Sequence, residues 1–248
     1  YIAKSIYDAL KDKYNITTIT RQDFNLTNYA ETWKFFTNKY FDVVIHTAVV
    51  GGSRLVADKS DVLDCNLQMY YNLLACKDHY NKFIHFGSGA EEHNPNGYYG
   101  FSKRVIAESI RFKQNFYNIK IYGVFDENEL PTRFIKASLM NYINKQAILV
   151  HEDKKMDFFY MKDLITLVDH HIKTDASKLY HASYCSYIQS YSLVDIANMI
   201  NELSDYKVGI LVGQKQIKDY ISSYNAGYSL DYVGLKKGII EVYNKLKI

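Results

Sequence analysis

The sequence predicts an α/β fold with a doubly wound parallel sheet, and two observations carry this prediction. Short apolar runs alternate with amphipathic segments of helical period through most of the 248 residues, as in strands joined by crossover helices. The run Val43-Val44-Ile45 is continuously apolar, as expected for a parallel strand that helices cover on both faces. A sheet of this kind binds its ligands at the carboxyl ends of its strands.

The composition is that of a globular protein. Hydrophobic residues make up 48% of the chain and charged residues 23%, and the net charge of +3 comes from scattered Lys and Arg, so no nucleic-acid partner is expected. No apolar run reaches the roughly 18 residues of a membrane-spanning helix, and no signal peptide is visible. The three cysteines lack metal-ligand spacing, so we expect reduced thiols, no bound metal and a cytoplasmic location.

The chain begins with an expected helix and strand. Apolar residues recur at helical spacing between Tyr1 and Tyr14, and the β-branched run Ile16 to Thr20 follows. A dinucleotide-binding βαβ unit places its glycine-rich loop before such a helix, so we expect that loop and its strand to precede Tyr1. Arg21 follows the expected strand, where an arginine suits the 2′-phosphate of NADP, and NADPH is therefore favoured over NADH. The alternative is a solvated arginine in a turn.

The later elements follow from the same two periodicities. Expected helices cover residues 30–40, 99–112, 132–143, 164–172, 193–203 and 232–247. Expected strands cover residues 42–46, 117–125, 147–150, 179–182 and 207–211, and a short apolar run beginning at Phe83 closes on Gly87.

The most informative stretch lies between Phe83 and Glu108. Tyr99 and Lys103 are four residues apart at the start of an amphipathic helix, so they share one face. The Lys103 ammonium is expected to lower the pKa of the Tyr99 phenol from about 10 and to prepare it for proton transfer. Ser88, at the end of the preceding strand, is placed to hydrogen-bond the same substrate oxygen.

Ser88 with Tyr99-Gly-Phe-Ser-Lys103 resembles the catalytic triad of the short-chain dehydrogenases/reductases. Arg21-Gln-Asp-Phe-Asn-Leu and Ala48-Val-Val-Gly-Gly-Ser53 resemble the extended branch of that superfamily, the NAD-dependent epimerase/dehydratase family, and within it the GDP-L-fucose synthases. The resemblance implies a Rossmann-like domain over residues 1–125. It also implies a small C-terminal α/β substrate-binding part over residues 126–248, with residues 156–182 returning to the first domain.

The resemblance also implies roles for individual residues. Tyr99 is the general acid/base, and Lys103 orients it and binds the nicotinamide ribose. The implied cofactor-binding residues are Arg21, Asp23, Thr47, Ala48, Val49, Asn66, Gly87, Lys103, Tyr122, Gly123 and Val124, and the implied substrate-binding residues are Gly52, Ser53 and Arg133. Arg54, Lys154 and Lys155 are candidates for the nucleotide phosphates.

The implied function is NADPH-dependent reduction of a nucleotide-linked 4-keto-6-deoxysugar, with or without 3,5-epimerisation, by a homodimer. The cysteine and histidine that epimerise in GDP-L-fucose synthases fall at Ala90 and Arg133, and neither exchanges a carbon-bound proton. Glu91, Glu92 and His93 are the nearest substitutes. Two alternatives stay open: an NAD-retaining nucleotide-sugar 4-epimerase or 4,6-dehydratase, and a catalytically silent nucleotide-binding member of the family.

Overall fold

The structure is a computed structural model that describes residues 1–53, 55–215, 218–225 and 227–247. Its contacts divide the chain into two compact units. The first, called the sheet unit here, contains residues 2–120 and 168–183. The second unit contains residue 1, residues 121–167 and the chain from residue 184 onward.

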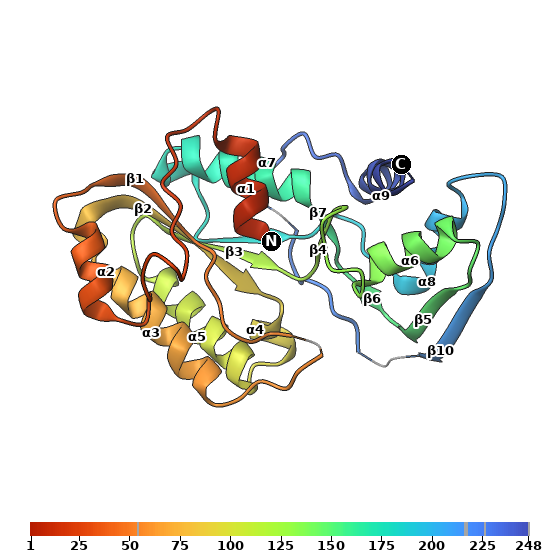
Figure 1. Cartoon of the computed structure of the whole chain (residues 1–248), viewed down its shortest axis with the longest axis horizontal. Coiled ribbons are helices and arrows are strands. Elements are labelled where there is room, and N and C mark those ends of the chain that lie inside the picture. The colour runs from red at the N-terminus through yellow and green to blue at the C-terminus, as the bar shows by residue number, and fades with distance from the viewer. Residues whose placement is uncertain (54, 216–217, 226, 248) are drawn as a thin grey trace. The chain divides into compact units, whose positions relative to one another are not determined.

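A four-stranded sheet in the order β1-β2-β3-β8 forms the centre of the sheet unit (Figure 1). Its strands are β1 (Phe41–His46), β2 (Tyr80–Ser88), β3 (Phe116–Ile121) and β8 (Ala182–Cys185). β1 and β2 pair in parallel, which places His46 opposite His85. β2 is buried at eight of its nine positions, because helices cover both faces of the sheet. The predicted α/β fold with a parallel sheet is confirmed.

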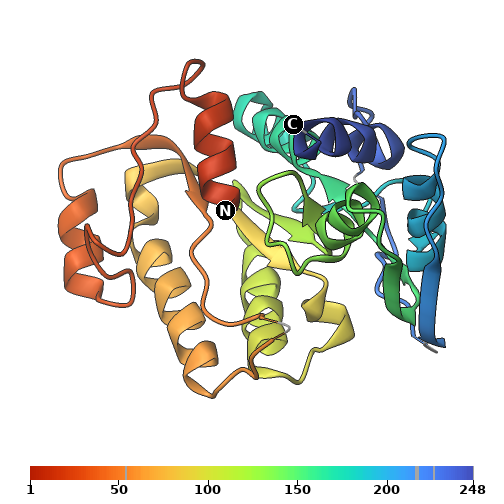
Figure 2. The same cartoon turned by 45° about the vertical axis from the view of Figure 1, so that its right-hand side comes forward.

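The helices of this unit lie on both sides of the sheet. They are α1 (Ile2–Leu10), α2 (Tyr29–Phe36), α3 (Asp61–Ala75), α4 (Ala90–His93), α5 (Tyr98–Arg111) and the C-terminal part of α7 (Met161–Lys173), with 3₁₀ turns at Lys77–His79 and Ala176–Lys178. In both views α3 and α5 lie side by side on one face of the sheet and α1 lies on the other (Figure 1, Figure 2). Tyr14, just after α1, donates to Asp169 of α7 at 2.8 Å.

The predicted strand at Ile16 to Thr20 is wrong. These residues form no strand, and residues 17–20 are exposed. A β-branched run becomes a strand only where a neighbour accepts its backbone hydrogen bonds. β1 is the edge strand of the sheet, and no described residue pairs with its outer side. Two other expected strands begin three residues late, with β8 at Ala182 rather than Leu179 and β10 at Ile210 rather than Lys207.

The second unit combines three short strand pairs with helices. β5 (Ile148–Asp153) pairs in parallel with β10 (Ile210–Lys215), and β4 (Val124–Phe125) pairs in parallel with β7 (Phe159–Tyr160). β6 (Lys155–Met156) is antiparallel to β9 (Tyr191–Ser192). The helices are α6 (Phe134–Ile143), α8 (Leu193–Asn201) and α9 (Leu235–Leu246), whose apolar faces share a core that includes Ile135, Leu139, Val150, Ile196 and Val242. No helix in the described part of the chain is long and apolar enough to span a membrane.

Candidate active site

The Tyr99–Lys103 pair lies on the first two turns of α5. The helix begins at Tyr98, directly after Gly97, and Tyr99 in its first turn is half-buried. Lys103 follows one turn later and is 4% exposed. Its Nζ lies 5.9 Å from the centre of the Tyr99 ring. The helix and the spacing predicted from the sequence therefore place the ammonium beside the phenol ring.

Two contacts hold the Lys103 ammonium against β2. Nζ donates to the carbonyl oxygen of Phe86 at 2.6 Å and lies 3.4 Å from Nε2 of His85. Burial lowers the pKa of the Lys103 ammonium to about 8, and the negative charge of Glu91 acts in the opposite direction. Because Phe86 precedes Ser88 by two residues, the bond to its carbonyl joins α5 to the end of the strand that carries Ser88.

A buried histidine pair lies behind Lys103. Nδ1 of His46 and Nδ1 of His85 are 3.1 Å apart, as expected for residues opposite each other on β1 and β2. Burial lowers the pKa of His46 to about 3 and that of His85 well below its ordinary value, so both rings are neutral near pH 7. A neutral His85 that accepts from Lys103 at Nε2 carries its proton on Nδ1 and donates it to His46.

Ser88 occupies the last position of β2 and is 9% exposed. Its Oγ accepts a hydrogen bond from the Ala90 N–H at 3.1 Å, and its own N–H donates to Oε1 of Glu91 at 2.9 Å. No described residue accepts the hydroxyl proton. The turn therefore orients Oγ while leaving its proton available to a ligand oxygen.

Gly52 lies against the Tyr99 ring. Its φ is +74°, in the left-handed region, and a Cβ at this position would lie 2.7 Å from Cζ of Tyr99. The Gly52 N–H donates to Oδ1 of Asp58 at 2.8 Å. Only glycine fits this position, because a side chain would occupy the space of the Tyr99 ring. Of the other residues predicted nearby, Ser53 is exposed and accepts from Leu55 N, and Arg54 lies outside the described residues.

Asn66 joins the loop after β1 to helix α5. Its side chain accepts from the Val50 N–H at 2.9 Å and donates to the Val50 carbonyl at 3.0 Å. It also donates to Oγ of Ser102 at 3.1 Å, and Ser102 donates in turn to the Tyr99 carbonyl at 2.7 Å. Asn66 thus fixes the relative position of the small-residue loop and the first turn of α5.

The predicted cofactor residues of the sheet unit fit a nicotinamide dinucleotide. Thr47 and Ala48 are half-buried at the C-terminal end of β1, where their small side chains let a ligand approach the backbone, and Val49 is 43% exposed. The third N–H of Lys103 has no partner among the described residues, which leaves one donor for a ribose hydroxyl. Arg21 is exposed in the turn that follows Thr20.

Two predicted cofactor residues have a clear local role in the fold. The Asp23 carboxylate accepts from the Thr20 N–H at 2.7 Å and from its Oγ1 at 2.8 Å, which closes the turn that presents Arg21. At Gly87 a Cβ would lie 2.3 Å from Oε1 of Glu91, so the absence of a side chain there serves protein packing.

The remaining predicted site residues belong to the second unit. Tyr122 is buried beside Tyr220, and the carbonyl of Gly123 accepts from Phe159 N at 2.7 Å. Val124 is buried on β4, and Arg133 is exposed at the N-cap of α6. Nζ of Lys154 lies 3.3 Å from Oε2 of Glu152, and Lys155 is exposed on β6.

The sequence did not reveal three features that shape the site, namely the Phe86 carbonyl, His85 and the Asn66–Ser102 bond. It named Glu91 as a candidate, but not its burial or its bond to the Ser88 N–H. The histidine pair left a signal, since each histidine lies near the end of a strand-like run. The contacts of the Phe86 carbonyl and of Asn66 join segments far apart in the chain and had no local signal.

The fold, the Tyr99–Lys103 pair and the strand-end serine are typical of the extended short-chain dehydrogenases/reductases. The chain belongs to the NAD dependent epimerase/dehydratase family, whose model matches residues 1–183. The family predicted from the sequence is thus confirmed. A search of curated proteins found no match.

Solved structures of similar fold cover almost the whole chain. A GDP-mannoheptose C4 reductase from Campylobacter jejuni with NADP bound has a TM-score of 0.81 at 14% identity, over 100% of this chain and 95% of the other. A GDP-L-fucose synthetase from Naegleria fowleri, also with NADP bound, has a TM-score of 0.75 at 15% identity, over 98% and 88%. A UDP-N-acetylglucosamine 4-epimerase from Bacillus cereus has a TM-score of 0.75 at 16% identity, over 100% and 93%. At these identities the likeness is one of fold.

Proposed function

We propose that this protein is an NADPH-dependent reductase of a nucleotide-linked 4-keto-6-deoxysugar. The observation that carries the proposal is the Lys103 ammonium, held by the Phe86 carbonyl at 2.6 Å on the strand that ends in Ser88, and 5.9 Å from the Tyr99 ring. This arrangement provides a proton donor, a fixed cation and a hydroxyl at one strand end. It suits the reduction of a carbonyl group to an alcohol.

In the proposed reaction Tyr99 gives its phenolic proton to the carbonyl oxygen as that oxygen becomes an alcohol. Lys103 stabilises the negative charge that develops on the phenol oxygen. Ser88 donates its hydroxyl proton in a hydrogen bond to the same substrate oxygen and so polarises the carbonyl. NADPH supplies the hydride when it is bound. Thr47, Ala48 and Lys103 would hold its nicotinamide side, and Asn66 would fix the loop that carries Thr47 and Ala48 through its bonds to Val50.

The preference for NADPH rests on Arg21. An exposed guanidinium at this point of a βαβ unit suits a 2′-phosphate, whereas an acidic residue would suit a free ribose. We expect Arg21→Ala to raise the KM for NADPH about tenfold and to leave the KM for NADH unchanged. An equal effect on both cofactors would refute the assignment.

The contacts of Glu91 and Glu92 favour reduction without epimerisation or dehydration. Glu91 is 5% exposed and uses its carboxylate to bind Ser88 N and Lys120. Glu92 forms an ion pair with the same Lys120 at 2.6 Å. Carboxylates engaged in this way are poor bases toward a sugar carbon. The other open alternative, a silent family member, has no chemical need for the ordered Tyr99–Lys103 pair.

The test is NADPH oxidation by the purified protein with GDP-, UDP- and dTDP-linked 4-keto-6-deoxysugars in deuterated water. We expect oxidation with one of these sugars and a product without deuterium at C3 or C5. Deuterium at C3 or C5 would show epimerisation. The absence of oxidation with every sugar would refute the proposal.

The matched variants are Tyr99→Phe and Tyr98→Phe. Tyr98 precedes Tyr99 on the same helix turn and is 47% exposed, so its hydroxyl is dispensable. We expect Tyr99→Phe to lower kcat by at least about 10²-fold and Tyr98→Phe to leave it unchanged. Equal activity of the two variants would remove Tyr99 from the mechanism.

We further propose that the protein is a cytoplasmic homodimer. Large apolar side chains are exposed on the adjacent helices α3 and α5 and at the C-cap of α5, namely Tyr71, Tyr98, Phe101 and Phe112. Burial of these side chains against a second copy would remove them from water. Light scattering during gel filtration should give a mass near twice the 28.9 kDa of this chain. A monomer at micromolar concentration would refute the proposal.

A further inference from the structure

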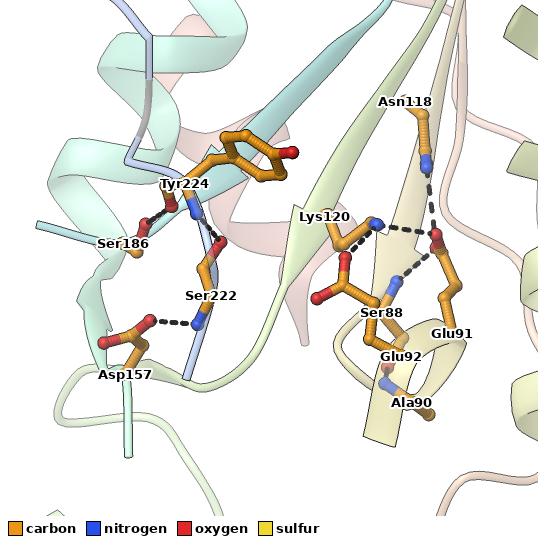
Figure 3. A network of polar contacts seen from close by, with 10 residues as sticks. All are labelled: Ser88, Ala90, Glu91, Glu92, Asn118, Lys120, Asp157, Ser186, Ser222 and Tyr224. Atoms are coloured by element: carbon orange, nitrogen blue, oxygen red, sulfur yellow. Dashed lines mark hydrogen bonds and ion pairs between the residues drawn. The ribbon is translucent and has the colours of Figure 1, made fainter. Parts of the chain in front are cut away.

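A buried ionic cluster lies directly behind Ser88. Glu91 on α4 is 5% exposed and Lys120 on β3 is 8% exposed. Nζ of Lys120 lies 3.2 Å from Oε2 of Glu91 and 2.6 Å from Oε1 of Glu92 (Figure 3). Burying such charges is costly, and a buried ion pair contributes little net stability compared with an apolar pair. The reaction proposed above assigns these residues no step.

Glu91 uses both oxygens of its carboxylate within the protein. Oε2 faces Lys120, while Oε1 accepts from the Ser88 N–H at 2.9 Å and lies 3.4 Å from Nδ2 of Asn118 (Figure 3). Asn118 and Lys120 are two residues apart on β3, so they point to the same face of the sheet. Glu91 therefore connects β3 to the turn that follows β2.

Gly87 leaves the space that this carboxylate occupies. A Cβ at Gly87 would lie 2.3 Å from Oε1 of Glu91 and 2.5 Å from Oδ1 of Asn118. Any side chain at this strand position would push the carboxylate away from Ser88 N. The bond between Glu91 and the Ser88 N–H therefore requires a glycine at position 87 of β2 as well as the Glu91–Lys120 ion pair.

We propose that Glu91, held in place by Lys120, is a positioning residue that fixes the turn carrying Ser88. The same turn orients the Ser88 hydroxyl, because its Oγ accepts from Ala90 N at 3.1 Å. Movement of the Ser88 backbone would carry this oxygen away from the substrate carbonyl. The inference rests on the proposed function for its effect on turnover.

The decisive variant is the double substitution Glu91→Leu/Lys120→Met. It removes both buried charges together and replaces them with apolar groups of similar volume, so the protein should still fold. We expect kcat to fall about 100-fold with KM within about twofold, because Ser88 is displaced. Glu91→Gln keeps an acceptor for Ser88 N, so kcat should stay within about tenfold of the wild type.

One further measurement separates positioning from simple structural support. The exchange rate of the Ser88 amide proton, measured by NMR, should rise about tenfold or more in the double variant and little in Glu91→Gln. Glu92→Gln is the matched control, since it removes a carboxylate from the same lysine without touching Ser88.

The outcomes are distinct. Slow turnover and fast amide exchange in the double variant, with a normal Glu92→Gln, would support the inference. Wild-type kcat or unchanged amide exchange in the folded double variant would overturn it, and so would equal effects in Glu92→Gln. If the wild type oxidises NADPH with no sugar, the proposed function fails, and the Ser88 amide still decides whether Glu91 fixes the turn.

Discussion

Replacing Gly52 by alanine should disable Tyr99 while leaving most of the protein intact. The added Cβ would lie 2.7 Å from Cζ of Tyr99, about 1 Å closer than the ~3.5–4.0 Å at which carbon atoms pack. The ring must therefore shift by about 1 Å, a displacement of a catalytic group that costs about 10²-fold in rate. The positive φ of +74° adds strain of about 1–2 kcal/mol for a residue with a Cβ.

Gly234→Ala is the matched control for backbone strain. Gly234 has a similar φ of +85°, but a Cβ there would meet nothing within 4 Å. Both variants should lose roughly 1–2 kcal/mol of stability, or about 2–8 °C in Tm. Only Gly52→Ala should show the large loss of kcat in the NADPH oxidation assay. Equal kcat values in the two variants would refute the contact between Gly52 and Tyr99 as the cause.

Three further outcomes are expected. Lys82 is 6% exposed and donates to the carbonyls of residues 171, 172 and 174 at 2.6–3.0 Å. Lys82→Met should therefore lower the free energy of unfolding, measured in urea, by about 3 kcal/mol. Lys77→Met, at an exposed position, should lower it by less than about 0.5 kcal/mol. His85→Leu removes a contact of Lys103 at 3.4 Å and should lower kcat about tenfold with an unchanged KM for the sugar; an unchanged kcat would exclude a role for this imidazole. Burial raises the pKa of Asp169, but its contacts with Lys13 and Tyr14 lower it more, so its pKa in the folded protein is below the ordinary value. The wild type should therefore be more stable than Asp169→Asn above about pH 4, and this difference in the free energy of unfolding should be lost as the pH falls further. A difference that persists at pH 2 would contradict this linkage.

Much of the fold was accessible from the sequence because its signals are local. Continuous apolar runs marked β1 and β2, and helical periodicity marked α5, α6, α7 and α8. The prediction failed at Ile16 to Thr20, where the residues have the right propensity but no neighbouring strand among the described residues. A strand depends on its hydrogen-bonding partner, and that partner is not encoded in the strand itself.

In the candidate site, too, local contacts could be predicted from the sequence and long-range contacts could not. Tyr99 and Lys103 belong to one helix, so their spacing alone placed the ammonium beside the ring. The contact of Lys103 with the Phe86 carbonyl joins residues 17 positions apart, and the bond from Asn66 to Ser102 joins residues 36 apart. No periodicity or motif indicates such contacts, because they depend on how strands and helices pack.

The class of fold and the family could be predicted from the sequence, and so could the proximity of Tyr99 and Lys103, because residues close together in the chain carry each of them. The groups that surround this pair became known only from the tertiary structure. The sequence suggested Glu91 only as a substitute residue for epimerisation and gave Lys120 no role, whereas the folded chain buries both in contact with each other and joins Glu91 to the Ser88 N–H. The free-energy cost of burying a charge arises only when the chain folds around it, so the sequence alone does not distinguish such a charge from an exposed one.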